Sequence, residues 1–595
     1  MIRLKQILKK VIMKNFPSIL GSGNCFFDNY QLWLIFKRVI LFLNRRNLIS
    51  STNHFTSFPK ISIILPTYNS NLQFLRKAID SVLTQNYPHW ELCVIDDCSN
   101  SSILIQFLKE LSALDSRIKV YFRLENGHIS KASNDGIKYS TGEYISFLDH
   151  DDVLERNALF RVVEAINKYP KAVLFYSDED KLNRFGIRVS PHFKPDWNYD
   201  LFLGYNYLCH FVVIKKGYAD LVGGFREGYE GAQDYDFLLR IIEKIDSSQI
   251  IHIPEILYHW RMIKGSASLN QDEKSYAKLA TEKLLMDHFN RLNIDASLRF
   301  FEKEKLFQPV YFLPKKEPLV SIIIPTRDRY KLVKICIESL IKFTKYSKYE
   351  IILIDNGSQE FESLNYFDSL KTYDSRIKIV RHDRPFNFSE LNNIGARNAK
   401  GDILLLLNND TEIFQPDWLT EMVSVQIQNN VGIVGAKLLY SDNLVQHAGV
   451  LIGTGGVAGQ INHLMPGNAS GYFNRAIIRQ SFSAVTGACL MIPSILYQKV
   501  GGLNEEKLAV AFNDIDLCLK VKQLGLRVVW TPHAVMYHHE SLSRGQEDTL
   551  EKKKRFQSEV NYMISTWSTD RYLDPAYNPN LNRSKANFYL NWSVR

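Results

Sequence analysis

Short apolar runs that end in polar residues alternate with helical patterns along the chain. Residues 59–65 (PKISIIL), 91–95 and 144–148 are apolar or β-branched, as in buried strands. Between them, residues 72–83 and 129–140 have apolar positions at helical spacing. Strands that alternate with helices form a mostly parallel sheet with helices on both faces. The pattern therefore predicts an α/β fold.

This pattern occurs twice. The segment SIILPTYN around Pro66 returns as SIIIPTRD around Pro325, 259 residues later, and Asp151 recurs at the same offset as Asp410. Two segments in which the same residues recur in the same order are copies of one domain, and each copy here has the size of a single domain. We expect five segments: an extension at 1–58, a first domain at 59–300, a linker at 301–317, a second domain at 318–548, and a helix with a tail at 549–595.

Carboxylates gather after the strand predicted at 144–148. Asp149, Asp151 and Asp152 follow this strand, and Asp410 takes the matching place in the second copy. Crowded carboxylates repel one another unless a cation lies between them, and Mg²⁺ is held by one or two carboxylates plus substrate phosphates. The alternative is an acidic helix N-cap, because Asp favours that position. We favour the metal because the pattern recurs in the second copy.

An aspartate also ends the second predicted strand of each copy. These residues are Asp96, which Asp97 follows, and Asp355. A carboxylate is a good acceptor for the N3–H donor of uracil or thymine. It can equally begin a turn, here before Cys-Ser or Asn-Gly-Ser. Position alone leaves both interpretations open.

Two further carboxylates open predicted helices after glycine-rich loops. Asp234 and Asp514 stand in GAQDYDFLL and FNDIDLCL, where a carboxylate can act as a general base or only cap the helix. About 25 residues later the copies contain His259 and the pair His538 and His539. These histidines are either ligands or structural residues.

The composition narrows the class of protein. The chain of 595 residues is 45% hydrophobic and 12% aromatic, so it can bury two sizeable cores. Seven cysteines without a CxxC motif argue against a disulfide framework or a zinc site. Residues 1–50 contain nine basic residues and one acidic residue, against a net charge of +10 for the whole chain. The two domains are therefore close to neutral, and we expect no nucleic acid as a partner.

The basic N-terminal stretch contains two apolar pieces, at 2–13 and 30–43. Both are too short to span a bilayer, and no small-residue cleavage site follows them. One interpretation is an amphipathic anchor that lies on an anionic membrane surface. The other is a helical extension that packs on the first domain.

Taken together, these motifs resemble the family 2 glycosyltransferases, which have the GT-A fold. The resemblance covers about 59–270 and 318–545. In the first copy it is carried by GAQDYDFLLR and LYHWRMIKGSAS, and in the second by LLLNNDTEI, VQHAGVLIGTGG, SAVTGACLMI, FNDIDLCLKV and YHHESLSRG. The combination is similar to two-domain bacterial transferases of O-antigen, capsule or rhamnan-type polysaccharide assembly.

The resemblance implies two tandem GT-A domains with mostly parallel sheets and an inverting transfer from a UDP- or TDP-sugar to a saccharide or lipid-linked acceptor. It assigns the general bases to Asp234 and Asp514. A Mn²⁺ or Mg²⁺ ion would be held by Asp149, Asp151, Asp152, Asp410, His259, and His538 or His539. The nucleotide would be held by Pro66, Thr67, Tyr68, Asn69, Asp96, Asp97, Pro325, Thr326, Arg327 and Asp355.

The copies also differ. Asn408 and Thr411 replace Asp149 and Asp152, so the second copy has fewer carboxylates for a metal. We expect a bifunctional enzyme of the cytoplasm that meets its acceptor at the inner face of the plasma membrane. Two alternatives stay open: only one domain is catalytic and the other binds the acceptor, or the chain is a carbohydrate-binding scaffold without turnover.

Overall fold

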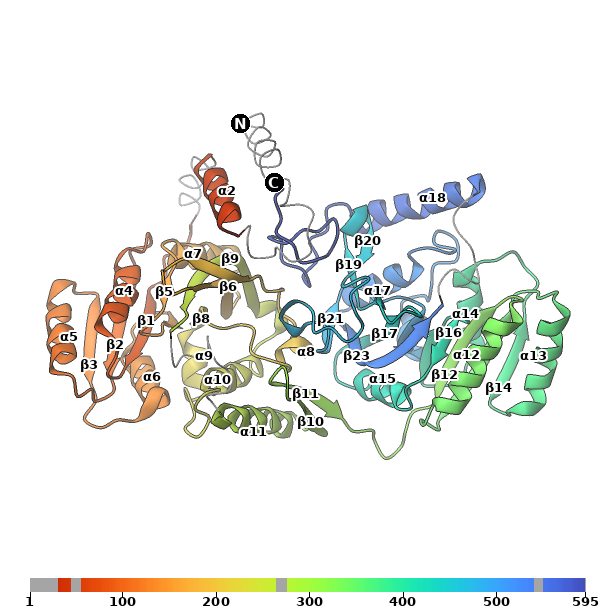
Figure 1. The fold of residues 1–595 in the computed structure, drawn as a ribbon, viewed down its shortest axis with the longest axis horizontal. Helices are drawn as coiled ribbons and strands as arrows, with labels where there is room; N and C mark the ends of the chain where they lie inside the picture. Colours follow the sequence, from red (N-terminus) through yellow and green to blue (C-terminus); the bar gives the residue numbers. More distant parts are fainter. Residues whose placement is uncertain (1–29, 44–54, 264–274, 540–548, 594–595) are drawn as a thin grey trace.

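The computed structural model describes residues 30–43, 55–263, 275–539 and 549–593 (Figure 1). It contains two α/β domains, each built on one large mixed sheet. The strand order is β3-β2-β1-β4-β8-β6-β9-β5 in the first domain and β14-β13-β12-β15-β22-β17-β23-β16 in the second. In each domain the first four strands of this order are parallel, and β8 and β22 run antiparallel to them.

The strands of the first domain are β1 (Ile61–Thr67), β2 (Trp90–Asp96), β3 (Ile118–Phe122), β4 (Tyr144–Phe147), β5 (Val153–Leu154), β6 (Leu174–Leu182), β7 (Arg188–His192), β8 (Val212–Lys215) and β9 (Ile250–Arg261). Its helices are α4 (Leu72–Leu83), α5 (Ser102–Leu114), α6 (His128–Tyr139), α7 (Ala158–Lys168), α8 (Tyr199–Phe202), α9 (Lys216–Leu221), α10 (Gln233–Ile242), η3 (Ser247–Gln249) and α11 (Ser275–Leu292).

The strands of the second domain are β12 (Val320–Thr326), β13 (Tyr349–Asp355), β14 (Ile377–Arg381), β15 (Ile403–Leu407), β16 (Thr411–Ile413), β17 (Val431–Leu439), β18 (Val445–His447), β19 (Val450–Ile452), β20 (Ala458–Gln460), β21 (Gln480–Phe482), β22 (Cys489–Pro493) and β23 (Arg527–His538). Its helices are α12 (Tyr330–Phe343), α13 (Phe361–Tyr373), α14 (Phe388–Asn398), α15 (Trp418–Gln426), η5 (Thr454–Gly456), η6 (Tyr472–Asn474), α16 (Ser494–Lys499), α17 (Asn513–Gln523) and α18 (Leu550–Trp567).

The predicted α/β class with two tandem domains is confirmed. The strands expected at 59–65, 91–95 and 144–148 are β1, β2 and β4, and the helix expected at 72–83 is α4. The offset of 259 residues that separates the two copies does not hold over one helix pair. The N-cap of α4 is Asn71 and that of α12 is Arg329, so the offset there is 258. A one-residue deletion in the loop before α12 explains the difference.

Glycines let a helix approach the parallel strands closely in both domains. A Cβ atom on Gly136 of α6 would collide with Ile64 of β1, and one on Gly395 of α14 would collide with Ile323 of β12. Only glycine lets the backbone of such a helix lie this close to a strand. The two glycines are 259 residues apart, so the close contact is a feature of the repeated domain.

The stretch expected as a linker at 301–317 contains part of a hairpin. The strands β10 (Ala296–Phe301) and β11 (Leu306–Tyr311) pair antiparallel and lie between the two domains, in the lower middle of Figure 1. The domains also touch directly, because Asp200 of the first forms an ion pair with Arg527 of the second. Arg479 donates to the carbonyl of Pro309 at 3.3 Å, which ties the hairpin to the second domain.

The described part of the N-terminal extension comprises residues 55–58 and a packed helix, α2 (Tyr30–Leu43). Tyr30 and Trp33 are buried, and the Tyr30 hydroxyl donates to Asp180 of β6 at 2.5 Å. Trp33 Nε1 donates to the carbonyl of Asn591 in the C-terminal tail at 3.0 Å. Residues 1–29 lie outside the described part of the chain. Within the described part, none of the helices has the length and apolarity needed to cross a membrane.

Candidate functional site

The first domain has a pocket of about 760 Å³ at the carboxyl ends of its parallel strands, here called the first pocket. Ligands of open α/β sheets bind at this edge. The fold brings Asp149 and Asp151, which follow β4, into one pocket with Asp234 at the start of α10. The expected residues that line it are Pro66, Thr67, Tyr68, Asp97, Asp149, Asp151 and Asp234.

The second domain has a matching pocket of about 930 Å³, here called the second pocket. Asp410 follows β15 and Asp514 lies in the first turn of α17, so the same two elements meet as in the first domain. The expected residues that line it are Pro325, Thr326, Arg327, Asp410, Asp514 and His538.

The carboxylates of the first pocket lie in a buried, acidic environment. Burial raises the pKa of Asp149, and the nearby Asp151 carboxylate adds to the rise. The neighbouring ring nitrogen His150 Nδ1 is buried and has no hydrogen-bond partner among the described residues. Within the described residues no group of three His, Cys, Asp or Glu side chains could hold a metal ion alone. Two carboxylates are the number that commonly holds Mg²⁺ when substrate phosphates supply further ligands.

Two residues expected at the metal lie outside the first pocket. Asp152 turns away and accepts hydrogen bonds from the Tyr258 hydroxyl at 2.6 Å and the Arg261 backbone N–H at 2.7 Å. His259 lies between Asp180, 2.6 Å from Nδ1, and Glu155, 3.3 Å from Nε2. Both side chains bind β9 to neighbouring segments, and neither is among the residues that line the first pocket.

The strand register explains the error for His259. In the first domain Val153, two residues after Asp151, pairs with His259. In the second domain the residue two after Asp410 pairs with Tyr537, so His259 corresponds to Tyr537. Because side chains alternate along a strand, the next residue in each domain points the other way, into the pocket. That residue is Trp260 in the first domain and His538 in the second.

The choice between His538 and His539 is settled by the same register. His538 Nε2 lies 3.0 Å from Asp410 Oδ1, and its Nδ1 lies 2.6 Å from Gln446 Oε1. His539 points away from the second pocket, toward Glu412 at 2.9 Å and Ser441 at 2.9 Å. Only His538 of the two is placed to act beside Asp410.

The comparison of the two copies along the sequence did not identify His210, which lines the first pocket. His210 precedes β8, and its Nδ1 lies 3.0 Å from Glu179 Oε2. Burial alone lowers the pKa of His210, but the Glu179 carboxylate outweighs it and the pKa rises to about 9. The pairing of β8 with β4 and of β22 with β15 shows that Ala488 takes this place in the second domain. The residue therefore does not recur, and a search for repeated motifs cannot find it.

The two candidate bases are held by different groups. Asp234 Oδ2 accepts from Cys209 Sγ at 2.7 Å and from Asn206 Nδ2 at 3.1 Å. Asp514 Oδ2 accepts from the backbone N–H of Gly487 at 2.7 Å, and burial raises the pKa of this carboxyl. Side chains therefore orient the first carboxylate, and the backbone orients the second.

Three of the residues expected at the nucleotide are not among those that line the pockets. Asp96 accepts from the Ser99 backbone N–H at 3.0 Å, and Asp355 accepts from Ser358 N–H at 2.9 Å and pairs with Arg381 at 2.9 Å. Asn69 completes the set, since its backbone N–H donates to Ser99 Oγ at 2.8 Å. These contacts favour the turn-forming interpretation of Asp96 and Asp355.

Comparison with known proteins places the chain among bacterial relatives. It is 47% identical over 532 residues to an uncharacterized protein of Sinorhizobium fredii, across 89% of this chain and 58% of that protein. It is 35% identical over 528 residues to an O-antigen biosynthesis protein of Myxococcus xanthus, across 88% of this chain and 40% of that protein. The chain thus spans about half the length of the curated relatives it matches.

A solved structure and a family model also match. A mannosyltransferase of Pyrobaculum calidifontis, solved with GDP-mannose and Mn²⁺, aligns with 45% of this chain and 70% of its own, at 16% identity and a TM-score of 0.33. The glycosyl transferase family 2 model matches residues 62–220 and 321–459, once in each domain and together half of the chain. The chain belongs to glycosyl transferase family 2.

Proposed function

We propose that both domains are inverting glycosyltransferases that build a cell-surface polysaccharide or lipid-linked oligosaccharide from UDP- or TDP-sugars. One observation carries the proposal: each domain joins a strand-end carboxylate and a helix-opening carboxylate in one pocket. Nothing in the sequence spacing alone requires this meeting. The relative of Myxococcus xanthus named for O-antigen biosynthesis supports a polysaccharide product.

Asp234 and Asp514 are the bases of the proposed reaction. A base must lie within hydrogen-bond reach of the acceptor hydroxyl, and each carboxylate lines its pocket. It takes the hydroxyl proton while the acceptor oxygen attacks the anomeric carbon and the nucleoside diphosphate leaves from the opposite face. One displacement of this kind inverts the anomeric configuration.

The residues at the strand ends fit a divalent cation, Mn²⁺ or Mg²⁺. In the first pocket Asp149 and Asp151 would hold it, and in the second Asp410 would hold it. When bound, such an ion neutralises charge on the leaving diphosphate. Thr67 and Thr326 line the same pockets and would help to orient the nucleotide.

Residues 1–50 bring the proposed enzyme to its acceptor. Their nine basic residues suit the anionic inner face of the plasma membrane, where a lipid-linked acceptor would be met. The described part of this stretch, α2, packs on the first domain and on the C-terminal tail. The membrane contact would therefore come from the remainder.

The proposal is tested by measuring UDP or TDP release from a panel of nucleotide sugars with Mn²⁺ or Mg²⁺ and membrane extract as acceptor. Wild type is compared with Asp234→Asn, Asp514→Asn and the control Asp80→Asn, an exposed residue of α4. We expect each base variant to lose a different donor or step and the control to behave as wild type. Full activity of Asp514→Asn would make the second domain an acceptor-binding module. No turnover of any donor would favour a carbohydrate-binding scaffold.

A further inference from the structure

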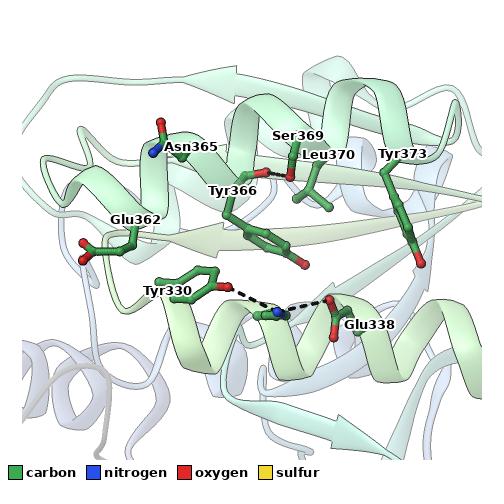
Figure 2. A pocket seen from close by; sticks show the side chains of 9 residues that line it. Tyr330, Glu338, Glu362, Asn365, Tyr366, Ser369, Leu370 and Tyr373 are labelled. Carbon is green, nitrogen blue, oxygen red and sulfur yellow. Dashed lines mark hydrogen bonds and ion pairs between the residues drawn. The ribbon is translucent and has the colours of Figure 1, made fainter.

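A groove of about 470 Å³ lies between α12 and α13 on the second domain (Figure 2). Tyr330 lines it from the start of α12, and Tyr366 and Tyr373 line it from α13. The Tyr366 side chain extends from α13 toward α12, and its ring meets that of Tyr330 edge to face with centroids 5.4 Å apart. The volume is within the range of about 300–1,000 Å³ that is usual for ligand pockets.

One buried polar group in this groove lacks a partner. The Tyr366 hydroxyl is buried and makes no hydrogen bond among the described residues. Burial also raises the pKa of Tyr366, so the hydroxyl remains a hydrogen-bond donor at neutral pH. Buried polar groups are nearly always hydrogen-bonded in native proteins. The unsatisfied hydroxyl therefore points to a ligand that supplies an acceptor.

The tyrosines are particular to the second domain. With the 258-residue offset for α12 and the 259-residue offset for α13, the corresponding residues of the first domain are Leu72, Phe107 and Leu114. None of these three has a hydroxyl group. The packing of the two helices is thus achieved without tyrosine in the first domain, and it gives no reason for three tyrosines in the second.

The charges of the groove disfavour an anionic ligand. Lys334 donates to the Tyr330 hydroxyl at 3.2 Å and lies 3.9 Å from Glu338. In Figure 2 these contacts are the dashed lines that run from the labelled Tyr330 and Glu338 to one unlabelled nitrogen. Glu362 adds a second carboxylate at the rim. One cation beside two carboxylates leaves the groove net negative, so a phosphate or an acidic chain would be repelled.

We propose that this groove binds a neutral saccharide. Phenol rings offer flat, rigid surfaces against which the C–H faces of a pyranose pack, and they carry a polar end as well. The Tyr366 hydroxyl and the two carboxylates can then bond with sugar hydroxyls, which both donate and accept. The combination of aromatic faces with a few polar groups is the usual chemistry of a small-molecule site.

The groove begins where the second pocket ends. Arg329 and Glu360 line the second pocket, and the Arg329 backbone N–H donates to Glu360 at 2.9 Å. Tyr330 and Glu362 of the groove follow them along the chain by one and two residues. A glycan chain held in the groove would therefore lie beside the second pocket. The identification of this glycan with the growing product rests on the proposed function; the binding itself does not.

The test exchanges the three tyrosines for the residues of the first domain, in the triple variant Tyr330→Leu/Tyr366→Phe/Tyr373→Leu of the full chain. Tyr366→Phe removes only a hydroxyl group, and the two Tyr→Leu changes fall at Tyr330, which is half-buried, and at Tyr373, which is exposed, so the fold should stay intact. The control is Tyr169→Leu, which removes an exposed tyrosine at the end of α7. The probes are immobilised neutral gluco-, manno-, galacto- and rhamno-oligosaccharides and acidic hyaluronan oligosaccharides. Turnover of nucleotide sugars is measured on the same preparations.

We expect wild type and Tyr169→Leu to bind at least one neutral series and the triple variant to bind it at least tenfold more weakly. The single variant Tyr366→Phe, which removes only the unpaired hydroxyl, should show a smaller loss. Equal binding by wild type and the triple variant, preference for the acidic series, or no binding of any probe would overturn the proposal. Absence of turnover with intact glycan binding would reject the proposed enzyme and leave the groove standing.

Discussion

The two pockets occupy the same place in the repeated fold but are built from different side chains. The first has two carboxylates after β4, and one of its histidines, His210, comes from the segment before β8. The second has Asn408 and Asp410 after β15, and its histidine, His538, comes from the end of β23. Each domain thus keeps the position of the pocket and two aspartates in it, which are 83 residues apart in the first domain and 104 residues apart in the second. The side chains around these aspartates differ between the two domains.

The largest expected effect is the loss of a base. Asp234→Asn and Asp514→Asn should each slow one transfer step by about 10²–10⁴-fold, because this is the usual contribution of general acid–base catalysis. The measurement is single-turnover sugar transfer, with product mass resolved for each step. The double variant should transfer nothing. If one single variant keeps the wild-type rate and the double variant is no slower than the other single variant, only one pocket is catalytic and the comparison is broken.

The next effect is a loss of folding stability at low pH, and we expect it to arise from His447 in the second domain. Burial lowers the pKa of His447 to about 4, and its Nε2 accepts from the Thr486 backbone N–H at 3.4 Å while Nδ1 faces Gln460. The unfolded chain protonates near pH 6.5, so between pH 6.5 and 4 the unfolded state binds the extra proton. The free energy of unfolding should therefore decrease as the pH is lowered from 6.5 to 4, by about 3 kcal/mol for this group alone.

Chemical denaturation of wild type and His447→Gln between pH 7 and pH 4 measures this effect. The variant cannot titrate at this position, so its stability should depend less steeply on pH than that of wild type. Identical slopes would mean that His447 does not stay neutral in the folded state.

A smaller effect, on Mn²⁺ affinity, is expected from exchanging Asp149, which follows β4, and Asn408, which follows β15. Asp149→Asn should weaken Mn²⁺ binding without nucleotide in the first pocket, and Asn408→Asp should strengthen it in the second, each on the order of tenfold because ligand charge tunes affinity. Titration followed by electron paramagnetic resonance counts free Mn²⁺ directly. Unchanged affinities in both variants would remove these carboxylates from the proposed metal site.

The smallest effect concerns the support of the bases. Cys209→Ala removes one of the two side chains that bond Asp234, and we expect a loss of about threefold to tenfold in kcat for the first transfer only. In the second domain the corresponding variant is Gly487→Ala, whose new Cβ would lie 3.3 Å from Asp514 Cβ. It should slow the second transfer only. Effects that cross between the domains would show that the two sites are coupled.

The sequence by itself determined the class of the fold and the existence of two similar sites. The alternation of apolar strands and helices, repeated with nearly one offset, is a local property that each copy displays independently. It also predicted strand ends at Asp151 and Asp410 and helix starts at Asp234 and Asp514, and side chains in these positions emerge at the carboxyl edge of the sheet. Residues in such positions are predictable from short stretches of chain.

Only the tertiary structure decided which neighbouring residues enter the pockets. His259 and His538 look equivalent along the chain, but the register of β9 and β23 turns one away from its pocket and the other into it. A shift of one residue reverses the direction of a side chain on a strand, and pairing across strands sets that register. His210 reaches its site by the same long-range pairing, through β8 beside β4. Contacts between distant segments therefore completed both sites, and no local pattern records them.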